Sequence, residues 1–145
     1  MIRAGVGQST HASTAQAVEE ALDLALAQAG SAQADAAVIF FSVEHAAPER
    51  GLAELVQRRA GTERIAGCSS SGVLTSGGEV EGGHGLAALV LASDQMDCRP
   101  FLFKPLQEHE SAIGADLARL AESCAGSTAL TALFPDTYHG QAQRF

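Results

Sequence analysis

Apolar residues follow a helical spacing in the first part of the chain. They recur at i, i+3, i+4 and i+7 from Val18 onward, which predicts a helix over Ser13–Ala29 that stops at Gly30. Ser13 and Gln16 fit a capping box at the start of this helix. The acidic residues of its early turns suit the positive end of the helix dipole.

Two more helices are expected from the same spacing. One starts near Pro48 and stops at Gly61, and another opens at Ser111 and closes at Gly126. Their apolar stripes are Leu52, Leu55, Val56 and Ala60 in the first, and Ile113, Leu117, Leu120, Ala121 and Cys124 in the second.

Short apolar runs between the helices predict strands. Ala36–Phe41 and Gly85–Ala92 are apolar on both alternating faces, so we expect them in the centre of a sheet that is covered on both sides. Arg64–Ala66 is read as the end of a short strand. The other strands expected are Ile2–Val6, Val73–Thr75, Glu79–Glu81, Asp97–Lys104 and Thr128–Phe134.

These elements predict an α/β fold, a layered domain with a mixed, largely buried sheet. The expected order is β-α-β-α-β, then short antiparallel strands, a helix and a final strand. At 145 residues the chain forms one domain, 1–145. Because the segment Gln141–Phe145 has neither a packing pattern nor a stop signal, we expect an N-terminal part of a longer protein.

Composition narrows the range of partners and sites that this chain can have. The net charge is −8 with no basic stripe, which argues against nucleic acid and against an anionic membrane surface as partners. No apolar run has the length of a signal peptide or a membrane span. Three widely spaced cysteines without a C-x-x-C argue against a disulfide framework and against a zinc site. We therefore expect a soluble, cytoplasmic protein without metal or cofactor.

The segment from Ile65 to Gly85 is the candidate site. It holds seven of the fifteen glycines, and the small residues after Gly67 allow close approach of a ligand to the backbone. A second polar loop follows the first strand and leads into the first helix, whose N-terminus favours an anionic group. The ligand-binding residues predicted are Gln8, Ser9 and Thr10 in one loop, Cys68, Ser69, Ser70, Ser71 and Gly72 in the other, and Glu79 and Glu81 beside them.

A catalytic site is less well supported. The Gly67–Gly72 segment lacks the second glycine of a nucleophile elbow, and the segment after Gly5 lacks the lysine of a P-loop. A Cys- or Ser-dependent hydrolase stays open as an alternative if a histidine approaches Cys68. The five histidines fall singly in expected loops, where they are read as solvated surface residues.

Three segments together resemble the FIST N-terminal domain. They are Ala4–Thr10, Ile65–Gly72 and Glu79–Gly83, with a buried strand between the first two and the turn Leu133–Asp136 after the last. The Gly-Cys-Ser-Ser sequence is the most specific part. Ser71, where that family more often has alanine, departs from its pattern, and His11 and His84 have no match in it.

The resemblance implies a bacterial sensory module of signal transduction that binds a small ligand such as an amino acid. It also implies a C-terminal FIST domain and an output partner such as a kinase or a cyclase. A haem-binding sensor and a purely structural half of a larger protein are further alternatives. We expect the two polar loops to approach each other and share a small pocket, with Glu79 or Glu81 meeting an ammonium group.

Overall fold

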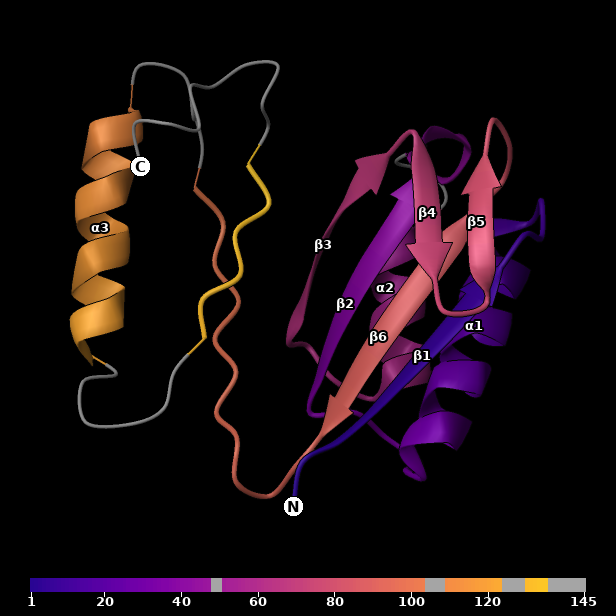
Figure 1. Cartoon of the computed structure of the whole chain (residues 1–145), viewed down its shortest axis with the longest axis horizontal. Helices are drawn as coiled ribbons and strands as arrows, with labels where there is room; N and C mark the ends of the chain where they lie inside the picture. The colour runs from indigo at the N-terminus through magenta and orange to yellow at the C-terminus, as the bar shows by residue number, and fades with distance from the viewer. Residues whose placement is uncertain (48–50, 104–108, 124–129, 136–145) are drawn as a thin grey trace. The chain divides into compact units, whose positions relative to one another are not determined.

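The computed structural model in Figure 1 describes residues 1–47, 51–103, 109–123 and 130–135. The chain divides into two compact units, Met1–Pro100 and Phe101–Phe145. The second unit contains α3 (Glu110–Ser123). The first unit contains β1 (Arg3–Ser9), α1 (Thr14–Ala29), β2 (Ala36–Ser42), the short 3-10 helix η1 (Val43–His45), α2 (Leu52–Ala60), β3 (Ile65–Ser70), β4 (Gly72–Thr75), β5 (Gly78–Glu81) and β6 (Leu86–Ala92).

Four strands form a mixed sheet in the order β1-β6-β2-β3. Strand β6 runs antiparallel to both of its neighbours, and β2 and β3 are parallel, so β1, β2 and β3 all point the same way. The two central strands are the ones predicted to be central from their apolar faces. The mixed α/β fold class is therefore confirmed.

Helices α1 and α2 pack against each other on one face of the sheet, and the β4–β5 hairpin lies on the opposite face (Figure 1). Strand β4 leaves the end of β3 and contacts β2, β6 and β1. Its last residue, Thr75, donates a hydrogen bond to the side-chain oxygen of Gln8 on β1. The hairpin thus spans the sheet near the carboxyl ends of the three parallel strands.

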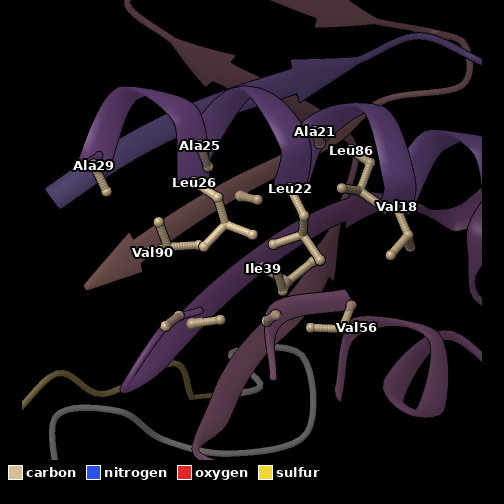
Figure 2. Packing of buried hydrophobic residues seen from close by; sticks show 14 of the residues in the cluster. Val18, Ala21, Leu22, Ala25, Leu26, Ala29, Ile39, Val56, Leu86 and Val90 are labelled. Carbon is tan, nitrogen blue, oxygen red and sulfur yellow. The ribbon is translucent and has the colours of Figure 1, made fainter. Parts of the chain in front are cut away.

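Branched apolar side chains fill the space between the helices and the sheet (Figure 2). Leu22 of α1 and Leu86 of β6 are both fully buried. Full burial of such a side chain contributes about 1.5–3 kcal/mol to stability. The other buried members labelled in the figure are Val18, Ala21, Ala25, Leu26, Ala29, Ile39, Val56 and Val90.

Helix α1 lies unusually close to β1, and two glycines permit it. A Cβ atom on Gly5 would lie 1.9 Å from the carbonyl oxygen of Ala25, and one on Gly7 would lie 1.9 Å from that of Ala21. Both contacts are with the helix backbone, which has no flexible end that can move aside. Alanines facing two glycines therefore set the distance between this helix and the sheet.

The helices agree closely with the prediction at their ends. Helix α1 begins one residue after its N-cap Ser13 and ends just before its C-cap Gly30, and α2 ends just before its C-cap Gly61. The capping box is wrong, because the Ser13 side chain makes no capping hydrogen bond. Helix α2 begins at Leu52, later than predicted, and α3 begins one residue before Ser111. Pro48, Cys124 and Gly126 lie outside the described residues.

Several predicted strand limits are wrong. Strand β3 starts at Ile65 and continues through Cys68, Ser69 and Ser70, so only Ser71 separates it from β4. The segment treated as a binding loop is thus mostly strand. The small residues of this segment continue the pairing of β3 with β2 as far as Ser70. Gly67 permits the close approach of the two strands, because a Cβ atom there would lie 1.8 Å from the Ile39 carbonyl oxygen.

Two strands predicted late in the chain are absent from the described residues. Residues 97–103 form no strand, and Pro100 in their middle cannot donate a ladder hydrogen bond. Residues 130–134 form no strand either. Lys104, Thr128 and Ala129, which complete the two predictions, lie outside the described residues.

The close α1–β1 contact yields the first prediction. We expect Gly7→Ala to lower the free energy of unfolding by about 3 kcal/mol, because the new methyl group forces the helix off the strand. Chemical denaturation followed by circular dichroism measures this loss. Gly83→Ala is the matched control, since a Cβ atom there meets nothing within 4 Å. Equal unfolding midpoints for the two variants would contradict the packing argument.

Candidate functional site at the carboxyl ends of the parallel strands

Each of the three parallel strands ends in a serine. Ser9 closes β1, Ser42 closes β2 and Ser70 closes β3, and all three lie at the same end of the sheet. Ser9 and Ser42 are buried, each with 2% of its surface exposed. Open α/β sheets bind ligands at this end, where the loops that follow the strands gather. The polar groups around these serines are therefore the candidate site.

Ser9 ties the end of β1 to the helix that follows. Its hydroxyl donates to the carboxylate of Glu20 on α1 and accepts a hydrogen bond from the backbone N–H of His11 at 3.1 Å. The backbone N–H of Ser13 in turn donates to Nδ1 of His11. The chain between β1 and α1 is therefore fixed by side chains that belong to its own residues and to α1.

His45 lies at the centre of the buried polar groups. It ends η1 directly after β2, and its side chain is fully buried. Its Nδ1 atom lies 3.0 Å from the hydroxyl of Thr14, the first residue of α1. Its ring centroid lies 5.3 Å from that of His84, in the loop before β6. The prediction that the histidines are solvated is wrong for His45, because the turn after β2 directs its ring under α1.

Ser42 joins β2 to the segment that leads into β6. Its backbone N–H donates to the carbonyl oxygen of Gly85 at 2.8 Å, and its hydroxyl accepts from the N–H of Gly85 at 3.0 Å. A hydrogen bond from the same hydroxyl holds the pKa of the Glu44 carboxyl below its ordinary value, helped by the Glu44 backbone and by the nearby rings of His84 and His45. Glu44 is therefore a stabilised carboxylate at neutral pH.

His84 has an unsatisfied nitrogen. Its Nδ1 atom is buried, and no hydrogen-bond partner reaches it from the part of the chain that the structure describes. A buried polar atom without a partner costs about 1–3 kcal/mol, so such atoms usually mark a place where a water molecule or ligand completes the bonding.

The residues predicted from sequence divide into two groups. Gln8 and Ser70 use their side chains within the fold, since Gln8 accepts from Thr75 and Ser70 donates to the Gly72 carbonyl oxygen at 2.6 Å. The exposed members are Thr10, Ser69 and Ser71. Strands β6 and β2 lie between β1 and β3, so the two predicted segments share one end of the sheet and are joined by β4.

Glu79 and Glu81 do not join the serine-bearing strand ends. Both are exposed on β5, where the side chains alternate and Val80 between them pairs with buried Val73 of β4. The two carboxylates therefore face away from the sheet. Their predicted contact with a ligand held by the other residues is not supported by this arrangement.

The two hollows described in the first unit lie elsewhere. One is lined by residues at the opposite end of the sheet, including Arg3, Asp35 and Asp94, and the other lies at the end of α2 around Gly61. None of the predicted ligand-binding residues lines either hollow. Neither hollow is therefore the predicted shared pocket, and the binding role of its residues stays a prediction.

Metal binding and attack by a cysteine thiolate each need a specific arrangement of side chains. Among the described residues, no three His, Cys, Asp or Glu side chains are arranged to hold a metal ion. Cys68 is half-buried on β3, and this burial raises the pKa of its thiol above the ordinary value. A nucleophilic cysteine needs the opposite shift, because the thiolate is the reactive form.

Sequence reasoning missed Thr14, Ser42, Glu44, His45 and Glu20. A signal existed for two of them, because Ser42 and Glu44 follow a strand that was correctly predicted to be central. His45 gave no such signal, since its burial depends on how η1 turns beneath α1. The sequence indicates Glu20 only as an acidic residue of an early helical turn, and its bond to Ser9 depends on the register between α1 and β1.

A scan against protein-family models matched the FIST N domain over residues 35–145, from the start of β2 onward. The chain belongs to the FIST N domain family. The match includes the Gly-Cys-Ser-Ser segment and the glycine-rich hairpin, and it leaves Ala4–Thr10 outside. A search of curated proteins found no match.

FIST N domains are commonly sensory domains of signalling proteins, and the family is not a known enzyme family. None of the described helices has the length and apolarity needed to cross a membrane. In this FIST N chain, the serine-ended strands carry two of the five buried polar residues described in the first unit, Ser9 and Ser42, and the others are Thr14, His45 and Thr62.

The raised pKa of Cys68 gives the second prediction. In a Cys98→Ser, Cys124→Ser variant, we expect Cys68 to react with iodoacetamide more slowly than a free cysteine at pH 7.5, because less of the thiol is ionised. The same variant in denaturant supplies the reference rate. Labelling in the folded state that outpaces the reference would support a reactive thiol and the hydrolase alternative.

Proposed function

We propose that this FIST N domain senses a small polar metabolite, such as an amino acid, at the carboxyl ends of β1, β2 and β3. The observation that carries the proposal is the gathering of buried Ser9, Ser42 and His45 with the stabilised carboxylate of Glu44 at this one end. Buried polar groups are costly unless they are fully bonded, so a fold keeps them where they have a role.

The surroundings of these groups suit a ligand of mixed polarity. Hydroxyl groups from Thr10, Ser69 and Ser71 are exposed at the same end of the sheet and add donors without adding charge. Neutral donors keep a site from binding every anion, which favours a zwitterion over phosphate or sulfate. The acidic balance of the chain, −8, likewise disfavours highly charged anions.

Binding of the ligand would be transmitted to a partner protein through the helices and strands that carry these polar groups. The end of β2 contacts α1 through His45 and Thr14 and contacts the start of β6 through Ser42 and Gly85. A ligand here would bias the packing of α1 and the β4–β5 hairpin. The resemblance suggests a C-terminal FIST domain and a kinase or cyclase as the recipients, in a cytoplasmic protein.

A thermal-shift screen of the twenty amino acids and common small carboxylates and amines tests the proposal. A ligand at a hundred times its dissociation constant stabilises the folded state by about 2.7 kcal/mol, which raises the melting temperature by several degrees. We expect Ser69→Ala to reduce this shift. Ser31→Ala, the same change in the turn after α1 at the opposite end of the sheet, serves as the control.

A metabolite that stabilises the wild type and both variants equally would place its site away from the strand ends. The absence of any shift across the whole panel would contradict the proposed function itself.

A further inference from the structure

Two histidines from different parts of the chain meet beside the carboxyl ends of the strands. His45 ends η1 and is fully buried, and its Nδ1 atom lies 3.0 Å from the hydroxyl of Thr14 on α1. The ring of His84, in the loop before β6, lies 5.3 Å from the ring of His45, measured between centroids. Two hydrogen bonds between Ser42 and Gly85 hold the segments that carry these rings together. The histidine pair therefore lies at the junction of α1, η1 and β6.

The surroundings of the two rings favour the neutral form of both. Full burial removes the ring of His45 from water, which disfavours a charge on it. A charged imidazole carries an N–H on each nitrogen, and each N–H needs an acceptor. The Nδ1 atom of His84 is buried, and no acceptor reaches it from the part of the chain that the structure describes. Two positive rings at this separation would also repel each other.

Glu44 acts in the opposite direction. It lies next to His45 on η1, and its carboxylate attracts a positive charge on either ring. Glu44 is only half-buried, so water screens this attraction, and its carboxylate already accepts a hydrogen bond from the Ser42 hydroxyl. The full burial of His45 therefore outweighs the attraction of a solvated carboxylate.

The other titratable groups near this end of the sheet have partners of their own or face away. The carboxylate of Glu20 on α1 accepts from the Ser9 hydroxyl, and His11 accepts from the backbone just before α1. The two carboxylates of the hairpin are exposed on β5 and face away from the sheet, and they belong to Glu79 and Glu81. These groups therefore offer little to offset a charge on the two buried rings.

We propose that His45 and His84 form a pH switch that loosens the junction of α1, η1 and β6 in mildly acidic conditions. A histidine in an opened, hydrated segment takes up a proton at its ordinary pKa of about 6.5, whereas the closed pair stays neutral. The opened form thus binds more protons, so the closed junction is stable above about pH 6.5 and becomes less stable as the pH falls below it. The switch goes beyond the sensory function proposed above, because it needs no ligand.

Native-state hydrogen exchange of the full chain, followed by NMR between pH 7.5 and pH 5.5, tests the switch. The reporters are the backbone N–H groups of Ser42 and Gly85, which bond across the junction. The reference is the N–H of Ala37, which donates to the Arg64 carbonyl oxygen at the other end of β2. Each rate is divided by the intrinsic rate of an unstructured peptide at the same pH.

We expect protection of the two reporters to fall by about tenfold to a hundredfold over this range, which corresponds to one or two histidines taking up a proton on opening. Protection of Ala37 should change by less than about threefold, because the opening is local. Constant protection of Ser42 and Gly85, or an equal fall at Ala37, would overturn the proposal.

The matched variants are His45→Phe and His109→Gln. The first keeps a buried ring and removes its titration, and the second removes an exposed histidine outside the first unit. We expect His45→Phe to weaken the pH dependence at the reporters by about tenfold and His109→Gln to leave it unchanged. His84→Gln with the same readout replaces His45→Phe if that variant folds poorly. A pH dependence equal to that of the wild type in both His45→Phe and His84→Gln would also overturn the proposal, and the sensory function would stand.

Discussion

The backbone contact between α1 and β1 is the constraint on which the first unit depends. Glycine on the strand faces the carbonyl groups of Ala21 and Ala25 on the helix, so the two elements approach more closely than larger residues would allow. This distance places Thr14, at the start of α1, within reach of His45, and it places Glu20 within reach of Ser9. The polar groups at the end of the sheet are therefore positioned by packing that occurs along its length. A change in the distance between α1 and the sheet would separate these polar groups without altering any of the residues that carry them.

The sequence predicts those parts of the fold that depend on local pattern. Both central strands follow from their two apolar faces, and the ends of α1 and α2 follow from Gly30 and Gly61. It fails where a pattern is ambiguous. The run of small residues after Gly67 suits a loop as well as a strand, and pairing with β2, a long-range contact, decides the matter. Near Pro100, three apolar residues were too short a pattern to secure a strand.

The candidate site was predictable in its place and only partly in its residues. Strand ends in an α/β sheet gather at one edge, so Ser9 and Ser70 could be assigned to the same end from sequence alone. The hydrogen bonds that these side chains make could not be assigned from the sequence. The alternation of a strand sends Gln8 to the hairpin side and Ser9 to the helix side, and both side chains are then used within the fold. His45 and Glu44 could not be placed, because the path of η1 under α1 has no sequence periodicity.

The central claim is that the ligand binds where the parallel strands end. Hydrogen exchange measured by mass spectrometry, with and without the amino acid that most stabilises the protein, tests this claim most directly. The account predicts added protection in the peptides that cover residues 42–45 and 82–85, and in the first turn of α1. Protection confined to the opposite end of the sheet, around Arg3, Asp35 and Asp94, would contradict it.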